Sequence, residues 1–215
     1  VAVIGAGPAG LAAAYYLQQK GHQAVIFDKN NQAGGELRLI GEELLPASVI
    51  DQEVAQILAT GVELRLNETI DSDRFVTLPD EFDAVIVATG TISEETSAFS
   101  LKASKTGFLA EKNSYQTSIP NVFAVGNSLR ASKLAVRSVG QGKEVAIVID
   151  NFLKTSEVKG YPERFNSKFG RLAESEFIQY KKDSEDAPRQ KSDASGFTKE
   201  AAMIEAKRCK HCDCR

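Results

Sequence analysis

Three glycines near the start of the chain have the spacing of a phosphate-binding turn. Gly5, Gly7 and Gly10 form a G-x-G-x-x-G sequence that follows the apolar segment 1–4 and opens a predicted helix. The first glycine allows a tight turn, the second lets the backbone approach a pyrophosphate, and the third lets the helix pack close to the strand. Pro8 suits the first helical turn, where its missing N–H would have no partner anyway. The pattern predicts dinucleotide binding at the start of this helix.

An acidic residue further along supports this prediction. Asp28 lies 18 residues after Gly10, at the end of the second predicted strand. A carboxylate at this place accepts hydrogen bonds from the hydroxyls of a ribose. The alternative is a glycine turn in a doubly wound fold that holds no nucleotide.

The elements that must position these residues alternate between strand and helix. Helical spacing of apolar residues follows the glycine turn until Gly21 and recurs over 48–59 and 133–153. The predicted strands are short apolar segments, at 1–4, 24–27, 62–66, 84–88 and 122–125. This order predicts a Rossmann-like α/β domain, a parallel sheet with helices on both faces.

Composition limits the classes of function. The 215 residues are 42% hydrophobic and 26% charged with a net charge of −3, which is typical of a soluble globular protein and argues against nucleic-acid binding. No apolar run approaches the roughly 20 residues of a membrane span. All three cysteines lie in the last seven residues, which favours a reducing, cytoplasmic setting. Because the chain begins at Val1 inside an apolar run, we expect it to be a domain of something longer.

Charge marks a predicted domain boundary. Residues 1–154 carry 13 Lys and Arg against 18 Asp and Glu, whereas residues 155–215 carry 13 against 11. The second segment is polar and dense in charge, so we expect a linker or extension with two short helices, at 171–182 and 198–208. The predicted domains are therefore a dinucleotide-binding domain at 1–154 and a charged, partly helical extension at 155–215.

Four motifs in order resemble one family. Residues 3–14, 33–38, 82–90 and 117–127 resemble the opening turn, the second glycine turn, the Ala-Thr-Gly strand end and the closing flavin strand of the pyridine nucleotide-disulfide oxidoreductases. The resemblance is closest to the glutamate synthase small-subunit branch. It implies that residues 1–154 are a flavin domain that binds FAD.

The resemblance also implies which residues line the cofactor. Asn127 stands where the family usually has an aspartate, so it brings a hydrogen bond there without a charge. The candidate cofactor-binding residues are Gly5, Ala6, Gly7, Pro8, Ala9, Gly10, Asp28, Lys29, Gly34, Gly35, Leu37, Arg38, Ala88, Thr89, Gly90, Gly126, Asn127, Lys133 and Leu134.

The last helix of the domain is expected to begin beside the flavin ring. A helix N-terminus there would stabilise the negative charge of reduced flavin. Gly140 and Gly142 lie in this helix, and the alternative is that they only allow close helix packing. Neither Lys133 nor Arg137 is assigned a catalytic role, and the catalytic residues stay unknown. His22, in the turn after Gly21, is expected to be exposed.

The chain has no room for the NAD(P)H domain that two-domain relatives insert. Gly90 and Ser118 are separated by 27 residues, and Arg38 and Val62 by 23. A βαβ unit needs roughly 30 residues or more. We expect the first segment to form a loop with short strands near 107–109 and 113–115. Any hydride donor must then come from another domain or subunit.

A cysteine cluster ends the chain. Cys209, Cys212 and Cys214 follow a Glu-Ala-Lys-Arg sequence that resembles the start of an iron–sulfur site in the glutamate synthase branch. A [4Fe–4S] cluster needs four ligands, so a further ligand would have to lie beyond Arg215. Zinc bound by the three cysteines and His211, or an end that binds no metal, are the alternatives.

Two functions follow from these patterns. The first is an FAD-binding oxidoreductase domain that passes electrons within a larger enzyme, to an iron–sulfur centre. The second is a non-catalytic module that binds FAD, ADP or NAD. An isolated domain that holds no nucleotide is a third reading.

Overall fold

The computed structural model describes residues 1–162, 173–182 and 184–209. The chain divides into two compact units, residues 1–162 and residues 163–215. The first unit contains the predicted nucleotide-binding motifs and is called the body below, and the second is called the extension.

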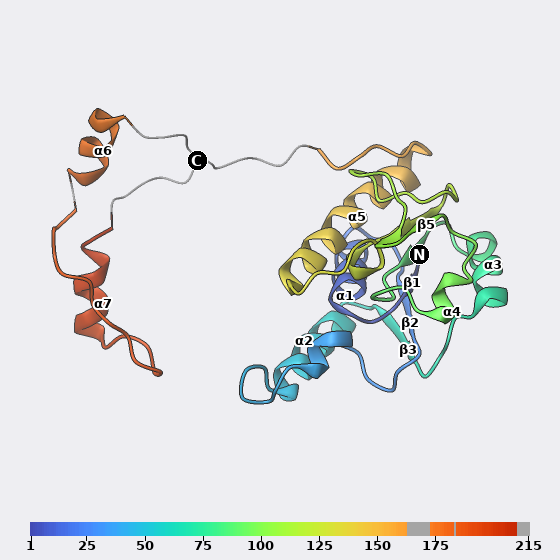
Figure 1. Cartoon of the computed structure of the whole chain (residues 1–215), viewed down its shortest axis with the longest axis horizontal. Helices are drawn as coiled ribbons and strands as arrows, with labels where there is room; N and C mark the ends of the chain where they lie inside the picture. The colour runs from blue at the N-terminus through green and yellow to red at the C-terminus, as the bar shows by residue number, and fades with distance from the viewer. Residues whose placement is uncertain (163–172, 183, 210–215) are drawn as a thin grey trace. The chain divides into compact units, whose positions relative to one another are not determined.

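The body is built on a five-stranded parallel sheet (Figure 1). Its strands, in the order in which they pair, are β3 (Glu63–Leu66), β2 (Val25–Asp28), β1 (Ala2–Ile4), β4 (Val85–Val87) and β7 (Val122–Ala124). The first three strands of the chain extend the sheet in one direction, and β4 then pairs on the other side of β1. The carboxyl ends of β1 and β4 therefore flank the point where the strand order reverses, which is where open α/β sheets bind ligands.

The central strands form because their side chains are apolar on both sides. Every residue of β1, β4 and β7 is buried, as a parallel sheet covered on two faces requires. These strands therefore appear in the sequence as continuous apolar runs, in which apolar and polar residues do not alternate. The predicted fold class is confirmed.

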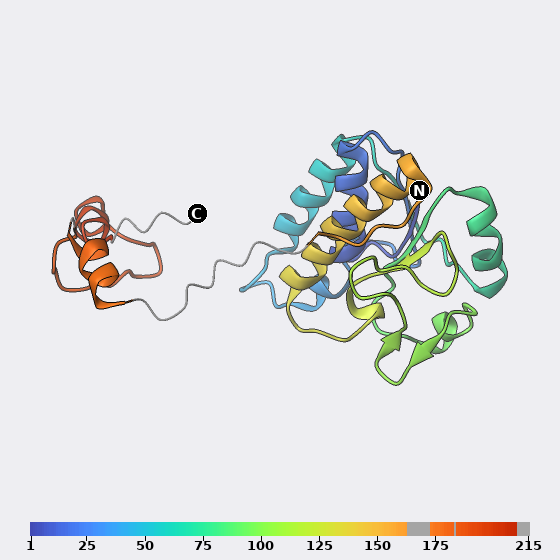
Figure 2. The same cartoon turned by 90° about the horizontal axis from the view of Figure 1, so that it is seen from above.

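Three helices cover one face. These are α1 (Pro8–Gln19), α2 (Ala47–Ala59) and α5 (Ala135–Thr155), which lie side by side in Figure 2. The backbones of α1 and α5 approach so closely at Gly142 that a Cβ added there would lie 2.4 Å from the Ala9 carbonyl oxygen. No atom lies within 4 Å of a Cβ added at Gly140. Gly142 therefore serves helix packing, and Gly140 does not.

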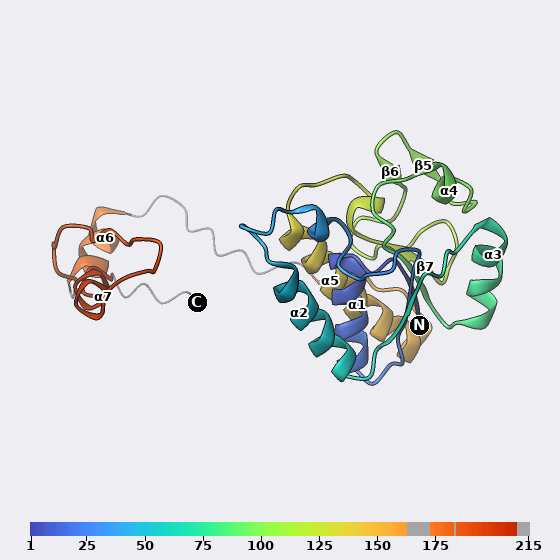
Figure 3. The ribbon, with the colours of Figure 1, turned by 90° about the horizontal axis from the view of Figure 1, so that it is seen from below.

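The opposite face is covered by α3 (Ser72–Glu81), the short α4 (Glu94–Ser97) and a hairpin of β5 (Ala103–Ser104) and β6 (Gly107–Phe108), as Figure 3 shows. The Phe75 ring from α3 stacks on the Phe99 ring with centroids 4.3 Å apart. The segment between Gly90 and Ser118 thus contains α4, this hairpin, turns and an isolated antiparallel bridge from Gln116 to Phe123 of β7.

Two predictions on the body need correction. Residues 113–115 are not a strand: the Tyr115 N–H donates to the Glu111 carbonyl, which closes a turn over residues 112–114, and Tyr115 has φ +62°. His22 is not exposed: its Nε2 lies 2.8 Å from Asp150 Oδ1, and 19% of its side chain is accessible. The helix α3 is missing from the predicted elements.

The extension has two short helices among its described residues, α6 (Glu174–Lys181) and α7 (Lys199–Ala206). Thr198 caps α7, since its hydroxyl oxygen accepts a hydrogen bond from the Ala201 N–H. Beyond residue 162, no residue whose burial is described is buried, which fits the charged composition. Across the parts of the chain that are described, no helix has the length and apolar character needed to cross a membrane.

Candidate functional site

Two positions of the turn after β1 have no room for a side chain. Gly5 has φ +107°, and a Cβ there would lie 2.4 Å from the Ala88 carbonyl oxygen at the end of β4. A Cβ at Gly10 would lie 2.0 Å from the Gly5 carbonyl oxygen. The fold itself requires these two glycines, because a larger side chain would push the turn off the sheet.

Gly7 differs from its neighbours. It has φ −79°, and no protein atom lies within 4 Å of a Cβ added there. Gly7 is the N-cap of α1 and provides no side chain to the first-turn N–H groups, and Pro8 occupies the first turn. The N-terminus of α1 therefore presents open donors and a positive dipole end to an empty space, which is the arrangement that binds phosphate.

The second glycine turn packs on the first. The Gly34 N–H donates to the Ala6 carbonyl at 2.8 Å, and a Cβ at Gly35 would lie 2.9 Å from Gly7 Cα. Gly34 and Gly35 both have positive φ, at +121° and +55°. Two motifs that are distant in sequence thus form one glycine-lined wall.

Asp28 is 7% exposed and its carboxylate organises the backbone around it. One oxygen accepts a hydrogen bond from the Ala6 N–H at 2.6 Å, and the other accepts from the Asn30 N–H and Nδ2, both at 2.8 Å. Because a carboxylate has about four acceptor positions, about one stays open to a ligand.

The end of β4 contributes an unpaired polar atom. Within the described part of the chain, Thr89 Oγ1 is buried and has no hydrogen-bond partner. Gly90, with φ +79°, has open space where a Cβ would be. Buried hydroxyls are nearly always hydrogen-bonded in folded proteins, so the Thr89 hydroxyl fits a ligand atom at this point.

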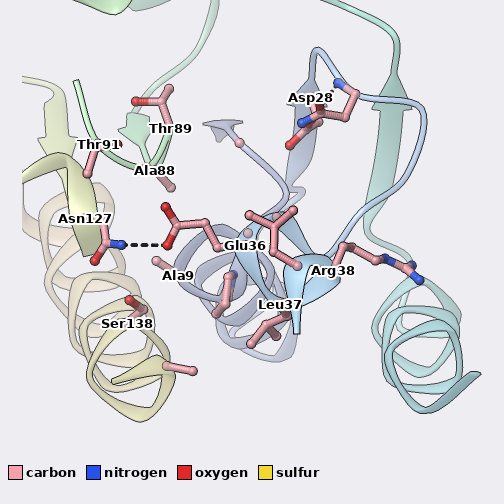
Figure 4. Close-up of a pocket in the computed structure, with 18 of the residues that line it drawn as sticks. Ala9, Asp28, Glu36, Leu37, Arg38, Ala88, Thr89, Thr91, Asn127 and Ser138 are labelled. Atoms are coloured by element: carbon pink, nitrogen blue, oxygen red, sulfur yellow. Dashed lines mark hydrogen bonds between the residues drawn. The ribbon is translucent and has the colours of Figure 1, made fainter. Parts of the chain in front are cut away.

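The turn after β7 closes the opposite side. Gly126 has φ +71°, and its N–H donates to Gln141 Oε1 on α5 at 2.7 Å. Asn127 Nδ2 donates to Glu36 Oε2 at 3.0 Å, and Asn127 Oδ1 accepts from the Ser132 N–H at 3.0 Å. Figure 4 shows the contact between Glu36 and Asn127 across the site, with Ser138 of α5 beside it.

These elements enclose a cleft of about 600 Å³, within the range of small-molecule sites. A smaller cavity of about 170 Å³ adjoins it and shares Gly5, Asp28, Asn30, Thr89 and Thr91. The smaller cavity also contains Lys29. The predicted residues that line the larger cleft are Gly5, Gly7, Pro8, Ala9, Asp28, Gly35, Leu37, Arg38, Ala88, Thr89, Gly90, Asn127 and Lys133.

The remaining predicted residues lie behind the lining or at its edge. Ala6, Gly10, Gly34 and Gly126 build the turns, and Leu134 is the exposed N-cap of α5. The cleft-lining residues that the sequence did not single out are Asn30, Asn31, Gln32, Glu36, Leu39, Ile40, Thr91, Ser132, Ala135 and Ser138. Most of them are sequence neighbours of predicted residues, so motif position is the signal that could have found them.

Arg38 has its partners within the protein. Its Nε donates to the Ala33 carbonyl at 2.8 Å and its Nη2 to Asp51 Oδ1 at 2.5 Å. Arg38 therefore holds the second glycine turn against α2, in addition to lining the cleft.

The cysteine cluster lies largely outside the described residues. Cys209 is exposed, whereas His211, Cys212 and Cys214 are not described. Among residues 1–162, 173–182 and 184–209, no three His, Cys, Asp or Glu side chains are grouped as metal ligands would be.

The fold and the cleft together define a Rossmann-like dinucleotide-binding domain. The cleft lies at the carboxyl ends of β1 and β4, and the uncapped N-termini of α1 and α5 both border it. Residues 3–60 match the NAD(P)-binding Rossmann-like domain family.

Relatives support the resemblance seen in the motifs. The chain is 36% identical over 150 residues to the beta subunit of the NADP(+)-dependent formate dehydrogenase of Moorella thermoacetica, covering 69% of this chain and 19% of that subunit. It is 44% identical over 92 residues to the PreT subunit of the NAD-dependent dihydropyrimidine dehydrogenase of Salmonella typhimurium, covering 42% and 22%. It is 36% identical over 92 residues to the glutamate synthase [NADPH] small chain of Bacillus subtilis, covering 42% and 19%.

Solved structures agree on the fold. A thioredoxin reductase from Gloeobacter violaceus superposes with a TM-score of 0.53 at 15% identity, over 77% of this chain and 97% of that one. A thioredoxin reductase from Streptococcus pyogenes gives 0.51 at 11% identity, over 72% and 97%. The resemblance to the flavin domain of the pyridine nucleotide-disulfide oxidoreductases is confirmed. The chain spans about a fifth of the length of the three curated relatives described above.

Proposed function

We propose that the body binds FAD and acts as the flavin domain of a larger oxidoreductase. The observation that carries the proposal is the two-ended form of the cleft. One end adjoins the small cavity beside Asp28, the middle borders the uncapped start of α1, and the other end lies between Asn127 and the start of α5. A dinucleotide has two phosphates between two bulky ends, so its three parts match the middle and the two ends of the cleft.

The residues present fit the cofactor. The first-turn N–H groups of α1 would bind the pyrophosphate, with room for it beside Gly7. Asp28 would accept from the adenosine ribose through its remaining acceptor position, and the unpaired hydroxyl of Thr89 would gain a partner. Asn127 and the N-terminus of α5 would border the flavin half.

Bound FAD would supply hydride and electron chemistry, and the protein's part is to bind and tune the cofactor. The N-terminus of α5 lacks a capping side chain and an acidic residue in its first turn, so it would favour negative charge on the flavin. Two of the relatives are named as subunits of dehydrogenases, one of a formate dehydrogenase and one of a dihydropyrimidine dehydrogenase. We extend this to the present chain, and propose that donor and acceptor belong to other domains or subunits.

We also propose that the acceptor is an iron–sulfur centre to which Cys209, Cys212 and Cys214 contribute. The spacing of the three thiols supports the proposal, because ligands this close in sequence can converge on one metal site. A fourth ligand would have to come from outside this sequence. The confinement of cysteine to the last seven residues supports a cytoplasmic setting for the protein.

The second candidate function is a non-catalytic module that binds an adenine dinucleotide. The neutral Asn127 favours it, since this residue brings no charge to the flavin half of the cleft. The two functions share the adenosine and phosphate contacts, and differ in whether a flavin is retained.

Reconstitution tests the proposal. Separate samples of the purified chain are mixed with FAD, ADP or NAD and freed of unbound nucleotide by gel filtration, and the nucleotide retained by each is measured. The FAD sample is also examined by visible spectroscopy before and after dithionite. We expect a retained flavin spectrum that bleaches on reduction. Retention of ADP or NAD without flavin would support the binding module instead, and failure to retain any of the three would overturn both functions.

A further inference from the structure

The start of α5 exposes apolar side chains beside the cleft. Leu134, Val136 and Val139 are 57%, 74% and 41% exposed. Lys133 and Ala135, which alternate with them along the chain, line the cleft, so this apolar surface lies at its opening. Exposed apolar residues that gather at one place on a soluble protein are characteristic of interaction sites.

The same segment is basic, and we call residues 130–139 the basic rim. Arg130, Lys133 and Arg137 are exposed, and no ion pair joins any of them to another residue in the described part of the chain. The longer segment 112–143 contains five Lys and Arg and no Asp or Glu, although the whole chain is net negative. Cations without partners around an apolar surface are complemented by an acidic protein surface.

The other side of the opening has the opposite charge. Leu39 and Ile40 line the cleft there, and the exposed Glu42 and Glu43 follow them in the chain. An acidic partner is repelled from this side and attracted to the basic rim, which fixes its orientation on the body. In the proposed function the flavin half of the cleft borders the start of α5, so the same attraction brings the partner to the flavin.

We propose that the basic rim is the docking surface for an acidic redox domain or subunit that exchanges electrons with the flavin. The inference rests on the proposed function, because it takes the flavin to be bound in this cleft. The exposed apolar side chains of the basic rim form the centre of the contact, and its three cations form the edge. The partner contacts only the α5 side of the opening, so the opposite side stays free.

The charge of the extension does not suit it to this role. Residues 163–215 carry 12 Lys and Arg against 10 Asp and Glu, so the extension has a small positive net charge and does not complement a basic surface. The acidic partner is therefore a domain or subunit other than the extension.

Two electron carriers of opposite charge test the surface: plastocyanin, an acidic copper protein, and cytochrome c, a basic haem protein. The FAD-loaded chain is reduced, freed of excess reductant without oxygen, and mixed with each oxidised carrier in a stopped-flow instrument. Each reduced flavin, as FADH⁻, gives one electron to each of two carrier molecules and leaves FAD and a proton. We expect the rate constant with plastocyanin to fall as salt rises, because salt screens the attraction, and that with cytochrome c to rise.

Charge reversal locates the attraction. Arg137→Glu should lower the rate constant with plastocyanin at low salt by about threefold or more, and adding Arg130→Glu should lower it by about tenfold in total. The matched control Lys159→Glu changes the charge by the same amount beyond the far end of α5, a helix of 21 residues that is about 30 Å long, and should leave the rate constant unchanged. The FAD retained by each variant is measured, so that loss of cofactor is not counted as loss of docking.

An uncharged substitution tests the apolar centre. Val136→Ser should lower the rate constant with plastocyanin by about threefold or more at every salt concentration, and should not affect reduction of ferricyanide, an anion too small to cover the rim.

The outcomes separate this inference from the proposed function. A chain that retains no FAD would overturn both. A chain that retains FAD, but whose reaction with plastocyanin does not slow as salt rises or slows equally in Arg137→Glu and Lys159→Glu, would overturn the docking surface alone. An unchanged rate constant in Val136→Ser would overturn the protein contact.

Discussion

Asn127 Nδ2 lies 3.0 Å from Glu36 Oε2, and this hydrogen bond joins two turns on opposite sides of the cleft. Glu36 follows the second glycine turn, and Asn127 follows β7. The contact connects residues 91 positions apart. It also gives a physical reason for an amide at position 127: an aspartate there would place two carboxylates within hydrogen-bonding distance of each other.

This relationship predicts the effect of Asn127→Asp. We expect the free energy of unfolding of the cofactor-free protein to fall by a few tenths to about 1 kcal/mol, because Glu36 is exposed and the repulsion is partly screened by solvent. Urea denaturation at low and high salt measures the change, which should shrink as salt rises. Adding Glu36→Gln should recover the loss. Equal destabilisation with Gln at position 36 would mean that the two side chains do not interact.

Gly7 offers a test of phosphate binding that leaves the fold intact. Gly7→Ala adds a Cβ into open space at an ordinary φ, so we expect the free energy of unfolding to change by less than about 0.5 kcal/mol. The same methyl group occupies the proposed place of the pyrophosphate, and the dissociation constant for FAD should rise by about tenfold or more. Flavin fluorescence titration measures the second effect.

Two glycines serve as controls for this prediction. Gly140→Ala also adds a Cβ into open space, but away from the cleft, and should leave FAD binding unchanged. Gly10→Ala places a Cβ 2.0 Å from the Gly5 carbonyl oxygen, so it should destabilise the cofactor-free fold itself. If Gly7→Ala binds FAD as tightly as Gly140→Ala does, the pyrophosphate does not lie beside Gly7.

The sequence predicts the sheet well because its central strands are buried on both faces. Val85, Ile86 and Val87 are all fully buried, and such strands appear in sequence as continuous apolar runs. The helix α3 gives no such signal: only Phe75 and Leu78 of its residues are buried, and Pro79 lies near its end. Asp71, whose carboxylate accepts a hydrogen bond from the Arg74 N–H, marks its start.

The site is predictable where a motif fixes the backbone locally, as at Gly5 and Gly10. Contacts between distant segments are not predictable in this way. Nothing in the sequence around Glu36 indicates that its side chain meets Asn127. The hydrogen bond from the Ala6 N–H to Asp28 likewise depends on the register in which β1 and β2 pair. That register cannot be predicted from the sequence of either strand alone.

Asp28 should therefore matter to the empty protein as well as to the nucleotide complex. Asp28→Ala removes the acceptor for the Ala6 and Asn30 N–H groups, and we expect a loss of about 1–3 kcal/mol of unfolding free energy without cofactor. Nucleotide affinity should fall in addition. Denaturation of the cofactor-free variant and FAD titration under native conditions separate the two effects. Unchanged stability would show that these hydrogen bonds contribute little.

Asp150 on α5 gives the body a defined response to acid. Burial disfavours its ionised form, but hydrogen bonds from Lys154 and His22 and the charge of Lys20 outweigh burial and lower its pKa to about 2. A depressed carboxyl pKa adds stability above the unfolded-state value, and that stability is lost as pH falls through the folded-state value. The contribution should be full above about pH 4 and should disappear towards about pH 2.

The variant Asp150→Asn should show this contribution directly. At neutral pH we expect it to lower the free energy of unfolding by roughly 1–2 kcal/mol, since the carboxylate loses its Lys20 ion pair and His22 hydrogen bond, which hold α5 to the end of α1, and its Lys154 ion pair within α5. Near pH 2 the two proteins should converge, because the carboxyl of the unaltered protein is then largely protonated. Urea denaturation at several pH values measures the difference. A difference that stays constant as pH falls would show that packing of this side chain, and not its charge, stabilises the contact between α1 and α5.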